Sequence, residues 1–191
     1  MIERTAEPME KKNNFWTIPN ILSVVRLCLI PVFMWLYCVK HNSLWTAIVL
    51  VASGLTDIAD GYIARHFNMV SDVGKALDPI ADKLTQGAML LALITQFPSM
   101  QVPFVLLLVK EAIVGIGSLV VIRKTDEVQG AVWHGKITTA LLYSTMVLHL
   151  LWPRIPKGLS NATLIACVAM MLISLVMYTL RNVKAYHAKN R

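Results

Sequence analysis

Four aspartates between residues 57 and 82 have the side-chain type and the spacing of a divalent-cation site. Asp57 and Asp60 are three residues apart and share one face of a helix, and Asp78 and Asp82, four residues apart, share a face of the next helix. The sequence around them is apolar, and a carboxylate within hydrocarbon is unfavourable unless it is neutralised, paired or bound to a metal. Where two such faces meet, they form a cage of hard oxygen ligands for divalent cations.

One of the four carboxylates also has a simple structural explanation. Asp78 precedes Pro79, and this pair is typical of a helix N-cap followed by proline at the first helical position. A cap accounts for one carboxylate and not for four, so a functional cluster remains the favoured interpretation.

The composition indicates that lipid is the main solvent of this chain. Of its 191 residues, 56% are hydrophobic and only 15% are charged, and the mean hydropathy is +0.59. The net charge of +7 arises from basic residues that lie between apolar runs and do not form a stripe. This distribution excludes nucleic acid as a partner and favours an anionic membrane surface or anionic substrates.

The apolar runs predict an all-α integral membrane protein with six transmembrane helices. Each run has close to the ~20 residues that cross a bilayer. We expect one domain over residues 1–191, with residues 1–15 as a polar cytoplasmic leader. The six expected spans are 19–39, 44–64, 78–97, 101–122, 134–152 and 160–180.

Basic residues at the ends of these spans predict the orientation. An even number of spans puts both termini on one side, and most lysines and arginines fall on that side; Lys40, Arg154 and Lys157 fall opposite. Positive charge is retained in the cytoplasm. We therefore expect both termini and the aspartates on the cytoplasmic face of a bacterial-type plasma membrane.

The motif Asp57-x2-Asp60-Gly61-x2-Ala64-Arg65-x8-Gly74-x3-Asp78-x3-Asp82 resembles the signature of the CDP-alcohol phosphotransferases at every fixed position. The resemblance implies a six-helix membrane enzyme, typically a homodimer, that moves a phosphatidyl or similar group from a CDP-linked donor to an alcohol and releases CMP. It implies two divalent ions, Mg²⁺ or Mn²⁺, held by Asp57, Asp60 and Asp78, with Asp82 as a ligand or as the general base.

The remaining positions of this motif are implied to bind the donor, CDP-diacylglycerol. Arg65 would pair with its phosphates through the planar fork of the guanidinium group. The small residues Gly61, Ala64 and Gly74 would leave room for the nucleotide or for close helix packing.

A phosphorylated acceptor alcohol needs cations of its own. Within the spans or near their cytoplasmic ends we expect these from Lys136, Lys110, Arg123 and Lys75, with Arg26 and Lys83 as further candidates. Two of these residues have an equally good structural explanation. Lys110 could simply pair with its neighbour Glu111, and Arg123 could be one of the positive charges that flank a span and set its orientation.

The acceptor itself is suggested by Gly135 to Thr139, which is similar to the Gly-Lys-x-Lys-Thr segment of phosphatidylglycerophosphate synthases, with Thr138 in place of the second lysine. This favours glycerol 3-phosphate as acceptor. Cardiolipin synthases of the same fold are an alternative, since the chain also resembles them at Thr17–Asn20 and Gly54–Asp57, and phosphatidylinositol-phosphate synthases are a third. A cation transporter would instead place its acids near the bilayer midplane, with access from both sides.

Overall fold

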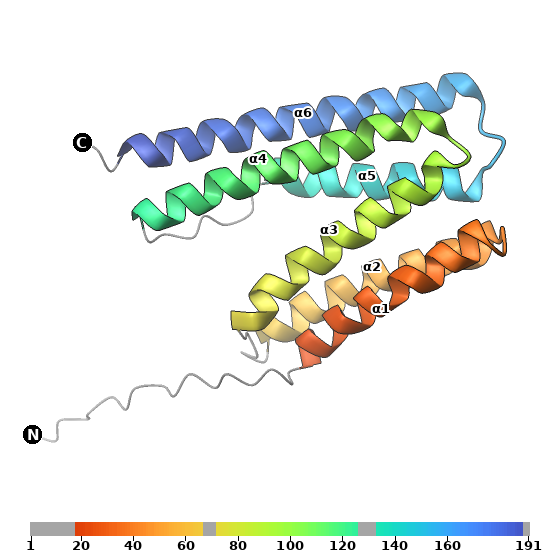
Figure 1. Ribbon diagram of the computed structural model, residues 1–191, viewed down its shortest axis with the longest axis horizontal. Coiled ribbons are helices and arrows are strands. Elements are labelled where there is room, and N and C mark those ends of the chain that lie inside the picture. The colour runs from red at the N-terminus through yellow and green to blue at the C-terminus, as the bar shows by residue number, and fades with distance from the viewer. Residues whose placement is uncertain (1–17, 67–71, 126–132, 189–191) are drawn as a thin grey trace, which may run out of the picture.

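The described chain consists of six α-helices and one short 3-10 helix (Figure 1). The computed structural model describes residues 18–66, 72–125 and 133–188, with side chains described for 20–56, 77–124 and 133–187. This part of the chain contains no strand. The elements are α1 (Ile18–Cys38), α2 (Ser43–His66), α3 (Asp72–Ile94), η1 (Pro98–Met100), α4 (Gln101–Thr125), α5 (Trp133–Leu151) and α6 (Lys157–Ala188).

The turn between α1 and α2 forms where polar residues interrupt the apolar sequence. His41 adopts a left-handed conformation with φ of 50°, which reverses the chain. Asn42 then caps α2, because its side-chain oxygen accepts a hydrogen bond from the backbone N–H of Trp45 at 3.1 Å. The predicted break between the first two spans is therefore confirmed.

The helices form two groups that diverge from one another. Helix α1 packs along α2 and α3, whereas α6 packs along α4 and α5. Helix α3 slants from the first group toward the second and meets η1 and α4 at its C-terminal end (Figure 1). The shared core lies where the groups converge and is built from buried residues of both, including Phe33, Leu50, Met89, Leu93, Leu142, Met146 and Met171.

Apolar side chains on the outer surface match a lipid environment. Helices α1, α4 and α6 are long and apolar enough to cross a membrane, and α2 has a shorter apolar stretch from Ser43 to Thr56. Large residues such as Ile116 of α4 and Ile165 of α6 point outward and are exposed. The chain is an integral membrane protein, and its all-helical fold with six α-helices is as predicted.

Two helix boundaries differ from the sequence-based expectation. Helix α3 begins at Asp72 and not near residue 78, so Pro79 lies inside the helix. Asp78 is therefore not an N-cap, and the capping explanation is wrong. Helix α6 continues to Ala188, beyond the expected end at residue 180. The reason is that hydropathy detects the part of a helix that faces lipid, whereas polar turns continue the same backbone hydrogen bonding at either end.

Candidate functional site

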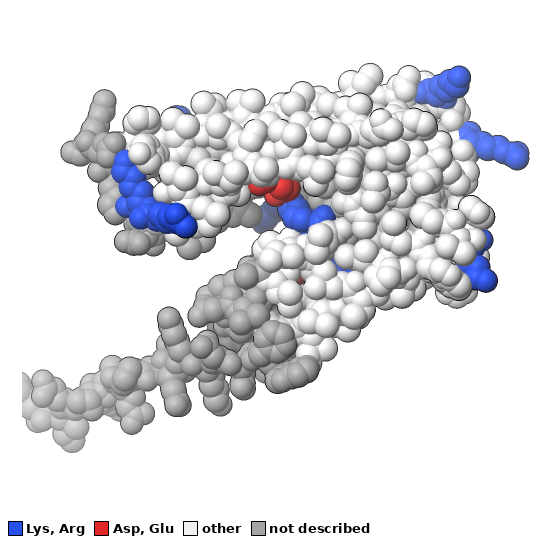
Figure 2. Space-filling model, viewed as in Figure 1, with Lys and Arg blue, Asp and Glu red and all other residues white. Residues whose placement is uncertain are grey.

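A cavity of about 1740 Å³ opens between the two helix groups and is lined by five of the six helices. Figure 2 shows it as a hollow in which acidic and basic atoms lie close together. One part of the wall is apolar and comes mainly from α2 and α5, with Leu50, Val51, Leu55, Val147, Leu148, Leu151 and Trp152. The other part is basic, with Lys83 of α3, Lys110 of α4, Lys136 of α5 and Arg181 of α6. Such a cavity suits a ligand with an apolar part and an anionic part.

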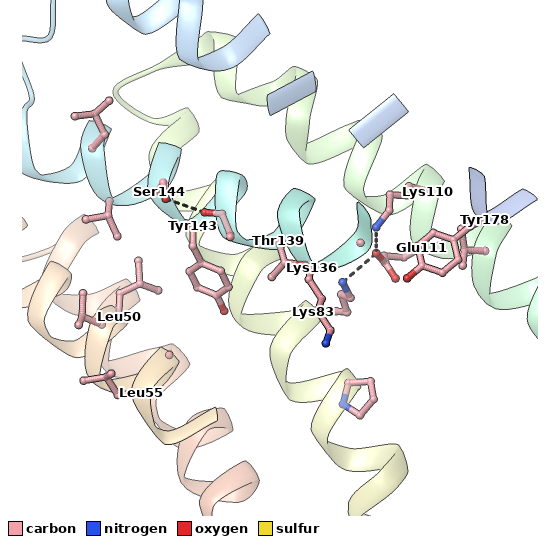
Figure 3. Close-up of a pocket in the computed structure, with 18 of the residues that line it drawn as sticks. Leu50, Leu55, Lys83, Lys110, Glu111, Lys136, Thr139, Tyr143, Ser144 and Tyr178 are labelled. Carbon is pink, nitrogen blue, oxygen red and sulfur yellow. Dashed lines mark hydrogen bonds and ion pairs between the residues drawn. The ribbon is translucent and has the colours of Figure 1, made fainter. Parts of the chain in front are cut away.

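The basic part of the wall is organised around Glu111. The Nζ atom of Lys110 lies 2.7 Å from Oε1 of Glu111, and the Nζ atom of Lys83 lies 3.1 Å from the same oxygen. Lys136 extends into the same region from α5, and the ring of Tyr178 lies beside Glu111 (Figure 3). Three helices thus bring ammonium groups to one place on the cavity wall.

Asp82 is held at this wall by two hydrogen bonds. The hydroxyl of Tyr143 donates to Oδ1 of Asp82 at 3.0 Å, and Nε2 of Gln86 donates to Oδ2 at 2.8 Å. Tyr143 and Lys83 both line the cavity, and Lys83 follows Asp82 directly on α3. Donors to both oxygens fix the orientation of the carboxylate.

Asp78 lies one turn before Asp82 and forms an ion pair across the helix interface. Nη1 of Arg26 donates to its Oδ1 at 3.1 Å. The Arg26 side chain is only 1% exposed, whereas that of Asp78 is 42% exposed, so the carboxylate keeps a face toward solvent. Arg26, expected among the acceptor cations, here links α1 to α3.

The other predicted site residues of α2 and early α3 lie outside the described side chains. Their backbone is helical: Asp57, Asp60, Gly61, Ala64 and Arg65 fall in the C-terminal half of α2, and Gly74 and Lys75 in the first turn of α3. Along the chain, α2 ends at His66 and α3 begins at Asp72, so only five residues separate these two helix ends. Among the side chains that the structure describes, no three acidic, histidine or cysteine residues are grouped as metal ligands.

The predicted acceptor cations separate into two kinds. Lys110 and Lys136 line the cavity, and so does Lys83. Arg123 is exposed in the last turn of α4, past the cavity-lining residue Ser118. The pair of Lys110 with Glu111 exists as the alternative interpretation supposed, but Glu111 is shared with Lys83, so it is more than a local compensation.

Sequence reasoning missed three residues of the cavity. Arg181 was expected beyond the last span, yet α6 continues past it; its guanidinium carbon lies 4.9 Å from the ring centre of Tyr178. In the sequence, Tyr143 and Tyr178 are tyrosines within apolar runs, and nothing in the sequence around them indicates a role in a site. Only the heptad-like spacing of Lys136 and Tyr143 on one face of α5 hints that they point the same way.

Comparison with known families finds that the family model described as CDP-alcohol phosphatidyltransferase matches residues 16–184. The match includes α1 to α5, all of α6 up to residue 184 and the whole cavity lining.

Individual relatives match over shorter stretches. A Rickettsia typhi protein named CDP-diacylglycerol–glycerol-3-phosphate 3-phosphatidyltransferase is 39% identical over 100 residues, 51% of this chain and 56% of that protein. A Streptomyces coelicolor protein named cardiolipin synthase (CMP-forming) is 44% identical over 73 residues, 36% of this chain and 34% of that protein. A Mycobacterium bovis protein named as a candidate cardiolipin synthase is 46% identical over 78 residues. That match spans 41% of this chain and 37% of the mycobacterial protein, so the similarity covers only part of each relative.

Proposed function

Because this chain belongs to the CDP-alcohol phosphatidyltransferase family, we propose that it transfers a phosphatidyl group from CDP-diacylglycerol to glycerol 3-phosphate. The products are phosphatidylglycerophosphate and CMP, which places the protein in phospholipid biosynthesis. The observation that carries this proposal is a cavity with three lysines on its wall, together with a carboxylate, Asp82, that is oriented by Tyr143 of the same wall.

The reaction needs a base for the acceptor hydroxyl. In our proposal Asp82 accepts that proton while the acceptor oxygen bonds to the phosphorus of the phosphatidyl group. The bond from this phosphorus to the bridging oxygen breaks, and CMP leaves with the electron pair. Tyr143 and Gln86 would hold Asp82 in line with the hydroxyl, and each of its oxygens keeps a lone pair for the proton.

The carboxylates also fit a divalent-cation requirement. Asp78 and Asp82, one turn apart, provide the hard oxygen donors that Mg²⁺ or Mn²⁺ prefer, and Asp78 has an open face. We propose that they act with Asp57 and Asp60, whose helix ends only five residues before the start of α3. Bound cations would neutralise charge on the attacked phosphate and on the departing phosphate.

The donor and the acceptor would occupy different parts of the cavity. Its apolar wall between α2 and α5 suits the acyl chains of CDP-diacylglycerol. We assign Gly61, Ala64, Arg65 and Gly74 to the cytidine diphosphate group on the strength of the family motif. The lysines at 83, 110 and 136 would bind the phosphate of the acceptor.

A cardiolipin synthase activity is the second candidate. Two of the relatives described above carry that name, and the apolar wall offers room for a lipid acceptor such as phosphatidylglycerol. Against it stands the number of lysines, since a phosphodiester carries one negative charge and a phosphate monoester carries two.

The deciding experiment follows CMP release by purified protein from CDP-diacylglycerol with glycerol 3-phosphate, phosphatidylglycerol or inositol 1-phosphate. We expect release with glycerol 3-phosphate and Mg²⁺, and its loss in excess EDTA. Asp78→Asn should lower the rate roughly a hundredfold, the scale of electrostatic catalytic groups. Release with phosphatidylglycerol alone would assign the cardiolipin synthase reaction instead.

A further inference from the structure

Glu111 is a carboxylate in the part of the cavity that otherwise gathers cations. Its Oε1 accepts from Lys110 at 2.7 Å and lies 3.1 Å from Nζ of Lys83. The two lysines come from different helices, α4 and α3, and converge on this single oxygen (Figure 3). We propose that Glu111 is a resident counter-anion, which pairs with both lysines in the empty site and is displaced by the phosphate of the acceptor.

The exposure of the three side chains supports displacement. Lys110 is only 8% exposed and is fixed by packing, whereas Lys83 and Glu111 are 33% and 31% exposed. Glu111 can therefore rotate along the cavity surface while Lys110 stays in place. Because both ammonium groups contact one oxygen, they are close enough for the oxygens of one phosphate to contact both.

Glu111 also balances the positive charge of the two lysines. Without an anion, two ammonium groups at this separation repel in a partly apolar wall. Glu111 removes that repulsion and keeps the lysines arranged for a phosphate, which is a form of preorganisation. The same ion pairs must be broken on binding, so an incoming anion has to offer more charge than the carboxylate it replaces.

Selectivity for dianions follows from this competition. A phosphate monoester carries two negative charges and three terminal oxygens, enough to engage Lys83, Lys110 and the neighbouring Lys136. A phosphodiester carries one charge, equal to that of Glu111, and gains little by displacing it. Glu111 is thus a positioning residue whose ion pairs oppose every incoming anion, and the two charges of a phosphate monoester outweigh that opposition more readily than the single charge of a diester; this inference rests on the proposed acceptor site but not on turnover.

The test is a binding titration without donor, on full-length protein in detergent micelles at constant ionic strength. The probes are methyl phosphate, a dianion at pH 8, and dimethyl phosphate, a monoanion. We expect Glu111→Gln to tighten methyl phosphate binding at least roughly threefold, the scale of one partly exposed ion pair. Dimethyl phosphate should gain a similar factor, because the same two ion pairs oppose its binding. Gln101→Lys, which adds the same unit of charge at the exposed start of α4, should change neither.

Unchanged or weaker methyl phosphate binding by Glu111→Gln would overturn the inference and leave Glu111 as a link between α3 and α4. If that variant does not fold, Glu111→Asp gives the same test, because the shorter side chain loosens both contacts and should tighten binding by a smaller factor. In turnover, the Gln variant should lower KM for glycerol 3-phosphate with little change in kcat. If glycerol 3-phosphate is no substrate at all, the acceptor assignment fails while the titrations still decide the role of Glu111.

Discussion

At the scale of residues, the site combines groups that spacing predicts with groups that only the fold brings together. The spacing of four residues between Asp78 and Asp82 predicts that they share a face of one helix, and both lie in α3. Tyr143 is 61 positions from Asp82. No local pattern selects it, because the contact depends on which face of α5 turns toward α3.

The hydrogen bond from Tyr143 to Asp82 gives the first prediction. Tyr143→Phe removes the donor to Oδ1 and keeps the ring. Hydrogen bonds to charged groups contribute about 1.5–3 kcal/mol, so kcat should fall roughly tenfold or more while KM for CDP-diacylglycerol stays nearly constant. Initial rates of CMP release measure this. Tyr37→Phe is the matched control: Tyr37 is buried in the α1 core, its hydroxyl has no hydrogen-bond partner in the described structure, and its removal should leave the rate unchanged.

The second prediction concerns the acceptor cation Lys136. Lys136→Gln keeps a polar side chain, one atom shorter, and removes its charge, so KM for glycerol 3-phosphate should rise roughly tenfold with KM for CDP-diacylglycerol unaffected. Lys184→Gln, on the exposed end of α6 and not part of the cavity lining, should alter neither constant. A rise in the donor KM alone would move Lys136 to the CDP-diacylglycerol site.

At the scale of elements, the sequence predicts where the helices lie along the chain, but not which face of each helix contacts its neighbours. Apolar runs locate all six helices, since each must satisfy its backbone internally in lipid. The polar first turn of α3 and the charged last turns of α6 escape that signal, and Arg181 was misplaced for this reason. Gly135, which sequence alone presents as a flexible point, lies within α5 where α6 approaches closely.

The third prediction tests that approach. A Cβ atom at Gly135 would lie 2.5 Å from the hydroxyl oxygen of Tyr178. Gly135→Ala should therefore displace the ring of Tyr178. We expect the displaced contact to cost about 1–3 kcal/mol, and the better helix propensity of alanine to offset about 1 kcal/mol of that cost. Thermal unfolding in detergent micelles should show a lower midpoint. Gly87→Ala on α3, where the added carbon meets nothing within 4 Å, should be neutral or stabilising.

At the scale of the whole molecule, the start of α1 and the end of α6 lie on the same side of the structure (Figure 1). The distribution of basic residues predicts that this side faces the cytoplasm. The two helix groups and the cavity between them follow from packing preferences that a hydropathy profile does not contain, because every helix is apolar on its lipid face. The sequence therefore predicts the number of helices and the reaction family, but not the shape of the cavity.

The fourth prediction is the orientation of the molecule in the membrane. In a variant without native cysteines, Ser99→Cys, in the exposed η1 segment between α3 and α4, should react with an impermeant maleimide added outside intact cells. Val70→Cys, between α2 and α3, should react only after permeabilisation. The reverse pattern would invert the orientation and place the aspartates outside.

The length of α6 has a consequence for the membrane around the protein. A continuous helix of 32 residues is about 48 Å long, whereas the hydrocarbon core is about 30 Å thick. The apolar part of the helix is close to the bilayer in length, and the excess is accommodated by tilt or by extension of the charged end into the headgroup region. Because Arg181 is rigidly attached near that end, the thickness of the bilayer sets the depth at which this cation sits. We therefore expect the thickness of the bilayer to change the position of Arg181, which lines the basic part of the cavity, relative to the lipid phosphates.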